Sequence, residues 1–359
     1  MSEIFSDSST TVMATPTDHA TTDANEVLPW VLTIHIILLF TSTVLIILSN
    51  VIVLLVFHFN KSLRDVTGIF IQSLACADLG VGIGCIFSIH SWFEEEWPYG
   101  ERFCTFTGFT LSAVLIVSIL NLLMLSIDRY IAVTRPLTYY SIMTRKKCYM
   151  CVAFVWVFSF TAFLPTLSGM GNYWYNYYTF ECAFEWERNS IFSTLLVGLV
   201  VLPAFSVSGF CYYHILKTCW AHKKQIHQVK SYFSGQESNE SSRVRHEGNL
   251  AKMFLVVVSG FYITWFPLLT VKILKGFVNI NIPPSVYFFS TWLGEFNSFI
   301  NCIVYSIGHK SFREYFHKMV SAGWTEVAKK FWNRDQRRQD QKKRKRPSIS
   351  PMMANESRV

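Results

Sequence analysis

The sequence predicts an all-α membrane protein, built as a seven-transmembrane helix bundle with an amphipathic eighth helix. Of the 359 residues, 51% are hydrophobic and only 16% are charged, which is too apolar for an ordinary soluble domain. Apolar stretches close to the length of a bilayer crossing recur seven times, and a basic amphipathic stretch follows the last of them. An odd number of crossings puts the two ends of the chain on opposite sides of the membrane.

The seven predicted spans set the domain organisation. They cover about residues 29–57, 66–92, 103–127, 148–170, 190–216, 251–273 and 284–307. We expect a disordered extracellular tail over residues 1–27, the bundle over 28–308, an amphipathic surface helix over 309–332 and a disordered cytoplasmic tail over 333–359. The connection over about 220–246 is polar and charged, which predicts a mobile cytoplasmic loop.

The basic residues orient the bundle, because Lys and Arg are retained on the cytoplasmic side of a membrane. The first 60 residues contain neither. Of the 32 basic residues, we place only Arg102, Arg188, Lys272 and Lys275 outside. We therefore expect a multi-pass plasma-membrane protein with an extracellular N-terminus and a first span that acts as an uncleaved anchor. The net charge of +8 then faces anionic lipid and an acidic partner, not nucleic acid.

The predicted surface helix carries Phe312, Tyr315 and Phe316 at helical spacing, interleaved with Lys310 and Arg313. Such a basic amphipathic helix is typical of a segment that lies on a membrane surface. A calmodulin-type target is the alternative interpretation.

The third predicted span begins at Cys104 and ends in Asp128-Arg129-Tyr130. A helix of this length is about 37 Å long, so its two ends face opposite compartments. Cys182 lies in the longest outer loop, and the two cysteines could pair because both face an oxidising compartment. That loop, at about 169–190, is rich in Tyr, Trp and Phe. It either folds over the bundle as a lid or forms a sticky surface for a partner, and we favour the lid.

Two carboxyl groups, of Asp78 and Glu295, lie inside predicted spans. An unpaired charge there costs on the order of 3 kcal/mol or more, so each needs a partner, a proton or a cation. A membrane transporter or proton channel, with Arg129 completing a relay, is one function that could use them. We find no inverted repeat in support of it. The chain also lacks a catalytic constellation, so we do not expect an enzyme.

Several short motifs, weak alone, occur together and in order. They are Asn50 in span one, Leu-Ala-x-Ala-Asp78 in two, Cys104 and Asp128-Arg129-Tyr130 in three, Trp156 in four, Pro203 in five, Phe261-x-x-x-Trp265-x-Pro267 in six, and Asn301-x-x-x-Tyr305 followed by Phe312 in seven and beyond. On these residues the chain resembles a rhodopsin-like (class A) G protein-coupled receptor over about 29–320. Cys302 replaces the usual Pro after Asn301, as in some orphan receptors near the amine and opsin branches.

The resemblance implies a receptor that passes an extracellular signal, or high basal activity, to a heterotrimeric G protein through outward movement of helix six. Arrestin and receptor kinases are implied partners. In the resting state Arg129 is expected to pair with Glu247, and Leu137 is the apolar residue that relatives insert into the G protein, which suggests the stimulatory class. The implied coupling residues are Asp128, Arg129, Tyr130, Leu137, Glu247 and Tyr305.

One departure concerns the fifth span. Cys211 stands eight residues after Pro203, where the family usually has Tyr. Tyr212 and Tyr213 are expected on other faces of the helix, which predicts loss of the usual active-state contact with Tyr305.

The resemblance also implies a sodium site. Its five oxygen-bearing side chains are those of Asp78, Ser118, Asn297, Ser298 and Asn301. An all-oxygen set suits a hard cation, and we expect no other metal.

The ligand pocket is implied at the outer half of the bundle. Its expected residues are Leu111, Phe261, Tyr262, Trp265, Lys272, Trp292 and Glu295. Leu111 stands where amine receptors carry an Asp, which argues against an ordinary amine ligand. Glu295 stands where opsins carry the retinal-binding Lys, so a retinal Schiff base is excluded. Glu295 is expected to meet a cationic ligand, stay protonated or bond the nearby aromatic residues, and Lys272 to meet an acidic group.

The C-terminal tail indicates regulation. Ser348 follows a run of Lys and Arg, which predicts either lipid binding or phosphorylation of Ser348 by a basophilic kinase. The chain ends in Ser357-Arg358-Val359, a pattern that PDZ domains can bind.

Overall fold

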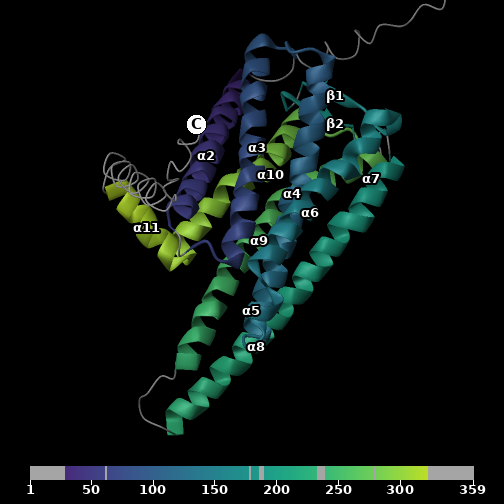
Figure 1. Ribbon diagram of the computed structural model, residues 1–359. Coiled ribbons are helices and arrows are strands. Elements are labelled where there is room, and N and C mark those ends of the chain that lie inside the picture. Colours follow the sequence, from purple (N-terminus) through teal and green to yellow (C-terminus); the bar gives the residue numbers. More distant parts are fainter. Residues whose placement is uncertain are drawn as a thin grey trace, which may run out of the picture.

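The computed structural model describes residues 29–60, 63–177, 179–185, 190–232, 239–278 and 280–321. Within these residues, seven long helices run side by side (Figure 1). They are α2 (Pro29–Phe59), α3 (Val66–Glu94), α4 (Glu101–Thr134), α6 (Arg145–Pro165), α8 (Leu202–Tyr232), α9 (Asn239–Val278) and α10 (Pro284–Gly308). The shorter elements are α5 (Tyr139–Ile142), α7 (Ser190–Leu196), α11 (Lys310–Ser321), and strands β1 (Tyr173–Asn176) and β2 (Glu181–Phe184).

Every predicted span lies inside observed helical structure. The fourth ends in a π-helical turn at Thr166–Met170, and the fifth combines α7, a π-helical turn at Val197–Val201 and α8. Six of the described helical segments are long and apolar enough to cross a membrane. The seventh member of the bundle, α10, carries Glu295, Asn297 and Asn301 on its buried face and packs between α2 and α9. The predicted fold class is confirmed.

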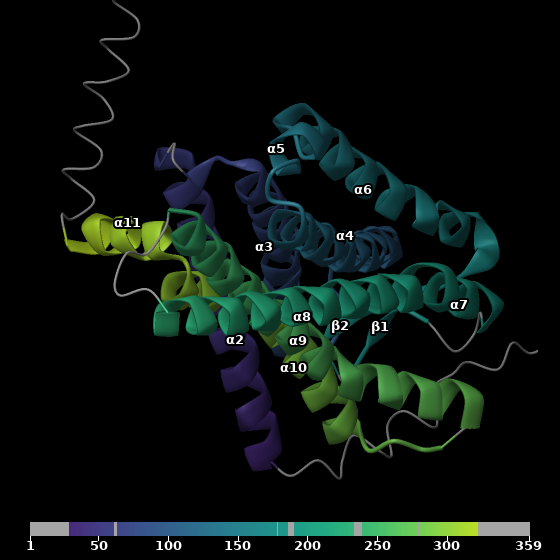
Figure 2. The ribbon, with the colours of Figure 1, turned by 90° about the horizontal axis from the view of Figure 1, so that it is seen from below.

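Helix α4 is the centre of the bundle. It packs against α3, α6, α8, α9 and both strands, and from below it lies between α6 and α8 (Figure 2). Its side chains Ala113, Val117 and Leu125 are fully buried. A helix with neighbours on most sides has to be apolar nearly all round, which explains why this stretch lacks a polar face.

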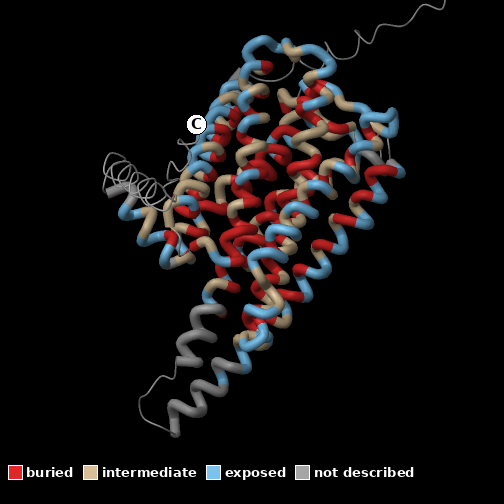
Figure 3. The backbone as a smooth tube through the Cα atoms, viewed as in Figure 1, coloured by how far each residue is buried: buried red, intermediate tan, exposed pale blue. Residues whose placement is uncertain are grey.

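The outer surface of the bundle is apolar. Buried residues concentrate along the inner faces of the helices, and exposed ones lie outside (Figure 3). Phe40, Phe154 and Leu199 are among the exposed large apolar side chains. In water such a surface would drive association, whereas in a bilayer it contacts hydrocarbon.

Side-chain hydrogen bonds join helices inside this apolar bundle. Trp156 donates from Nε1 to Ser73 Oγ at 3.0 Å. Asn50 donates from Nδ2 to the backbone oxygens of Ile46 and Ser298, both at 2.9 Å. Trp156 and Asn50, two of the motif residues, thus link neighbouring helices, and each link is worth about 1 kcal/mol.

The prediction of a mobile loop over 220–246 is wrong for most of that stretch. Helix α8 continues to Tyr232 and α9 begins at Asn239, and both project past the rest of the bundle (Figure 1). Lys, Gln, Glu and Arg are strong helix formers, so a charged stretch can prolong a helix into water. Residues 233–238 lie outside the described part of the chain.

The surface helix α11 turns away from the bundle end (Figure 1). Phe312 is fully buried, with its ring 6.0 Å from Phe57 and 6.3 Å from Tyr305. This apolar contact fixes α11 to the bundle. The predicted continuation of this helix over 322–332 and the predicted tails over 1–27 and 333–359 lie outside the described residues.

Candidate functional site

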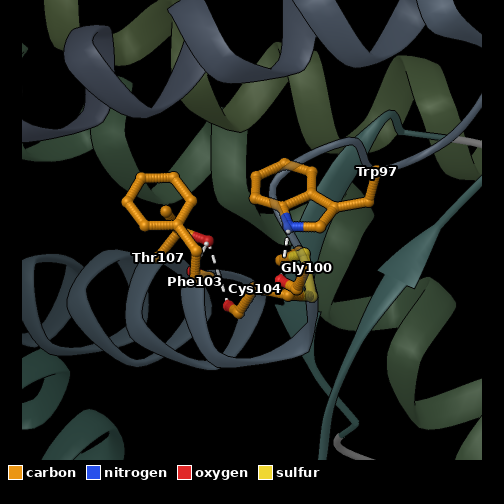
Figure 4. Close-up of a disulfide and its surroundings, with 6 residues drawn as sticks. Trp97, Gly100, Phe103, Cys104 and Thr107 are labelled. Atoms are coloured by element: carbon orange, nitrogen blue, oxygen red, sulfur yellow. Dashed lines mark hydrogen bonds between the residues drawn. A yellow bond between two sulfur atoms is a disulfide. The ribbon is translucent and has the colours of Figure 1, made fainter.

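A hairpin of the second outer loop covers one end of the bundle. Strands β1 and β2 pair antiparallel, with Tyr173 opposite Phe184 and Tyr175 opposite Cys182. A disulfide joins Cys182 to Cys104 with a Cα–Cα distance of 5.2 Å, which fastens β2 to the first turn of α4 (Figure 4). The pairing is confirmed. We call residues 173–184 the lid.

A glycine lets the lid rest directly on α4. A Cβ atom at Gly108 would lie 2.6 Å from the Tyr173 ring and 3.1 Å from the Cys182 backbone oxygen. Tyr173 also pairs through its hydroxyl with Thr166 Oγ1 at 2.8 Å, and burial raises the pKa of Tyr173 to about 12. The lid prediction is confirmed, although Tyr178 and Trp186 lie outside the described residues.

Beneath the lid lies a cavity of about 110 Å³. It is bounded by β2 above and by α3, α4, α9 and α10 around it, and it extends inward to Asp78. Five of the predicted pocket residues line it, namely Leu111, Phe261, Trp265, Lys272 and Glu295. Phe184 of the aromatic loop also lines it, as do Glu181 and Tyr287, which the sequence did not single out.

Two predicted pocket residues lie outside this lining. Tyr262 stacks on Phe205 of α8, with ring centroids 3.4 Å apart. Trp292 is buried in a separate apolar cluster with Phe288 and Cys85. Neighbouring residues of a helix point in directions about 100° apart, so Tyr262 faces away from the side that Phe261 presents to the cavity.

Glu295 has partners that its position in the sequence did not indicate. The Cys85 thiol donates to Glu295 Oε2 at 3.2 Å, and Glu181 of the lid is its electrostatic neighbour. Burial and a second carboxyl group close by both disfavour the charged form of a carboxyl group. Burial raises the pKa of Glu181 to about 7, against the opposing effect of Lys272. An acidic pair therefore lies where the lid meets α10.

Lys272 lies beside this acidic pair. Its Nζ donates to the Tyr287 hydroxyl at 2.6 Å and lies 5.1 Å from the centre of the Tyr287 ring. The acidic group that the sequence led us to expect near Lys272 belongs to the protein itself, because Glu181 is its electrostatic neighbour.

The inner end of the cavity is polar. Asn301 donates from Nδ2 to Asp78 Oδ2 at 2.9 Å, and Ser298 lies near the same carboxylate. Ser118, Asn297 and Ser298 line the same end of the cavity. The Oδ1 atoms of Asn297 and Asn301 are buried, with no hydrogen-bond partner among the described residues. These oxygens fit a hard cation next to a carboxylate.

At the opposite end of α4, Asp128 and Arg129 form a buried network. Arg129 donates from Nη2 to Asp128 Oδ2 at 2.6 Å and also to Thr67. The Tyr139 hydroxyl of α5 donates to Asp128 Oδ1 at 2.7 Å. Burial and the neighbouring Asp128 raise the pKa of Tyr139, so it stays a neutral donor. Sequence reasoning missed Thr67 and Tyr139, because each looks like an ordinary hydroxyl residue.

The other predicted coupling residues lie around this network. Leu137 is 91% exposed, so it is free to contact a partner. Tyr130 packs toward α8, with its ring 6.0 Å from Phe210. The Glu247 side chain lies outside the described residues, so its ion pair with Arg129 stays a prediction.

Tyr305 is buried, and its hydroxyl has no hydrogen-bond partner within the described part of the chain. Tyr212 is also buried, and it lies near Tyr305, Ser126 and Arg129. The expectation that Tyr212 faces elsewhere is therefore wrong. Both Cys211 and Tyr212 are buried, because the inner face of α8 is wide enough here to include two consecutive positions.

Known proteins show the same order of features. A family model described as "7 transmembrane receptor (rhodopsin family)" matches residues 49–305. The chain belongs to this family. Among relatives of this receptor, human "Probable G-protein coupled receptor 21" is 33% identical over 300 residues, covering 82% of this chain and 85% of that one. "G-protein coupled receptor 52" of Bos taurus is 34% identical over 286 residues, 78% of each chain.

The fold of the receptor also matches a solved structure. The crystal structure of squid rhodopsin superposes with a TM-score of 0.73 at 24% identity, covering 82% of this chain and 87% of that one. At this identity the likeness concerns the fold alone. Family membership makes the chain a multi-pass membrane receptor that couples to G proteins, and not an enzyme. The transporter alternative is not favoured.

Proposed function

We propose that this receptor activates a heterotrimeric G protein of the stimulatory class by outward movement of α9, and that it does so with high basal activity. The observation that carries the proposal is the position of the lid in the cavity. Its residues Glu181, Cys182 and Phe184 line the cavity together with Phe261 and Trp265 of α9. The protein's own side chains thus occupy the position from which a ligand would act on α9, and only about 110 Å³ is left open.

The geometry at the inner end supports the movement of α9. The Arg129 guanidinium lies 5.8 Å from the centre of the Phe254 ring of α9. Outward displacement of α9 would remove this ring and open Arg129 to a partner. Leu137, exposed beside it, would supply the apolar contact that stimulatory G proteins accept.

The polar inner end of the cavity supports a sodium ion as a modulator. Asp78 would supply the charge, and Ser118, Asn297, Ser298 and Asn301 the neutral oxygens. A cation held there would link α3, α4 and α10, and it would favour the arrangement in which these helices are closest.

The remaining parts of the proposal concern location and regulation. The acidic, Lys- and Arg-free N-terminal stretch supports an extracellular N-terminus at the plasma membrane. Arrestin, receptor kinases, a kinase acting on Ser348 and a PDZ protein at Val359 are proposed partners of segments outside the described residues.

The decisive experiment measures nucleotide exchange. Receptor in nanodiscs is mixed, without ligand, with each of the main heterotrimer classes. We expect exchange on the stimulatory heterotrimer, its loss in Arg129→Ala, and higher exchange in Glu247→Ala. Failure to accelerate exchange on any heterotrimer, in the wild type and in Glu247→Ala alike, would refute basal coupling, and exchange on another class alone would refute the assignment of class.

A further inference from the structure

A second, larger cavity lies on the outside of the bundle. It is a groove of about 650 Å³ whose floor is α4 and whose walls are α6 on one side and the π-helical turn with α8 on the other. From below, α6 and α8 stand on either side of α4 (Figure 2). Leu123 and Met124 line the floor, Phe154 and Phe158 one wall, and Leu199 and Ala204 the other. It shares no lining residue with the cavity beneath the lid.

The groove opens toward lipid and excludes water. Phe154 is 66% exposed and Leu199 72% exposed, so both rims belong to the membrane-facing surface. Lys147 is the single charged residue among those that line it, and the others are apolar. Water would find almost no hydrogen-bond partner along such a trough, whereas a hydrocarbon chain would gain contacts along its whole length.

Lys147 stands at the cytoplasmic end of the groove. It is exposed, and its Nζ donates to the Ile142 backbone oxygen at 3.1 Å. That bond uses one of the three N–H groups of the ammonium and leaves two to bind an anion. Arg145 and Lys146, in the same turn of α6, add positive charge nearby. The cytoplasmic leaflet is the one that carries anionic lipid.

We propose that this groove binds one anionic phospholipid of the cytoplasmic leaflet, with an acyl chain along α4 and the headgroup on Lys147. The apolar trough selects the chain, and the single cation at its end selects a negative headgroup. The π-helical turn Val197–Val201 contributes Leu199 and Val200 to the wall, and turns of this kind recur at functional sites. The binding does not depend on the G protein proposal.

The test uses full-length receptor in nanodiscs of phosphatidylcholine containing a minor fraction of phosphatidylserine. Lipids that stay bound after transfer to detergent are identified and counted by native mass spectrometry. We expect one retained phosphatidylserine on the wild type. Lys147→Gln should lower its retention about fivefold, as expected for one Lys near an anionic surface. The matched control Lys146→Gln removes the same charge one residue away, outside the lining, and should lower retention clearly less than Lys147→Gln does.

A second pair of variants tests the position of the chain. Val207→Trp places a large side chain in the groove and should reduce retention of the lipid whatever its headgroup. Val157→Trp adds the same bulk at a membrane-facing position that does not line the groove, and it should have no effect. Equal retention of phosphatidylcholine and phosphatidylserine by the wild type would overturn the proposal, as would equal effects of Lys147→Gln and Lys146→Gln. If Val207→Trp does not fold, the lysine pair decides the question.

Discussion

At the scale of single residues, the site depends on contacts between side chains that are distant in sequence. Glu295 accepts a hydrogen bond from Cys85, which is 210 positions away, and lies near the carboxyl group of Glu181. Asp128 accepts from Tyr139 and Thr67 as well as from its neighbour Arg129. In each case a buried charged or polar group is satisfied by a residue from another element, as the cost of an unpaired group requires.

The buried carboxyl group of Glu181 makes the lid sensitive to pH. Because burial raises the pKa of Glu181 from 4.5 to about 7, the stability it contributes is fully present below pH 4.5 and is lost as the pH rises through about 7. Hydrogen exchange of the 173–184 backbone should therefore be slower at pH 5.5 than at pH 8, after correction for intrinsic rates. Glu181→Gln should remove this dependence. The control Glu96→Gln, at an exposed position of another outer loop, should keep it, and a lid that loosens equally in both variants would contradict the assignment.

Tyr212 offers a second prediction at this scale. Its ring is buried near Tyr305, whose hydroxyl lacks a described partner. In the active state, a water-mediated contact between the two hydroxyls would replace the contact that relatives usually make with a Tyr at the position of Cys211. Tyr212→Phe should then lower basal nucleotide exchange several-fold, without lowering the melting temperature. Tyr213→Phe, whose side chain is 63% exposed, is the matched control. Unchanged exchange in Tyr212→Phe would exclude this role.

At the scale of elements, α4 joins the parts of the receptor. Its first turns hold the lid through Cys104 and Gly108, its middle lines the cavity, and its last turns carry Asp128 and Arg129. A helix of 34 residues therefore connects the lid with the buried network of Asp128 and Arg129 at the other end of the bundle. The lid cannot shift without a response at α4, because a disulfide and a close backbone approach both fix it there.

Gly108→Leu tests this connection. The added side chain would overlap the Tyr173 ring and the Cys182 backbone, so the lid should lift from α4. We expect faster hydrogen exchange in β1 and β2 and several-fold lower basal nucleotide exchange. Gly209→Leu is the control, because a Cβ at that position of α8 meets nothing within 4 Å. If hydrogen exchange of the lid in Gly108→Leu is as slow as in the wild type, the hairpin does not need the glycine.

At the scale of the whole molecule, the cavity beneath the lid and the polar site at Asp78 form one continuous space between helices. Asp78, Ser298 and Glu295 line it together with the lid residues. A cation at Asp78 would therefore stabilise the arrangement of α3, α4 and α10 that the lid also contacts. This is the physical basis on which two sites of a bundle influence each other.

Sodium binding should appear as added thermal stability. At constant ionic strength, replacing choline chloride by sodium chloride should raise the melting temperature of the receptor by an amount that grows with sodium concentration, as RT ln(1 + [Na⁺]/Kd) requires. Asp78→Asn should abolish the dependence. Glu101→Gln, a carboxylate lost from an exposed position at the start of α4, should preserve it. A wild-type melting temperature that does not change with sodium concentration would refute the proposed sodium site.

Much of the fold followed from local patterns. Seven apolar stretches of sufficient length can only be satisfied as helices in a bilayer, because every backbone polar group there needs a partner within its own segment. Motif order placed Asp78, Asn301, Arg129 and Trp265 correctly in the bundle. The charged ends of α8 and α9 were misjudged, because polarity alone does not distinguish a loop from a helix that continues into water.

Hydropathy and the order of motifs by themselves determined the family and the spans, because both can be read directly from the order of residues in the chain. Only the tertiary structure decided which residues meet. It paired Glu295 with Glu181, turned Tyr262 and Trp292 out of the cavity, brought Tyr139 to Asp128 and formed the groove beside Lys147. These outcomes depend on helix rotation and on where a lid comes to rest, and such geometry is set by packing between segments that no local pattern specifies.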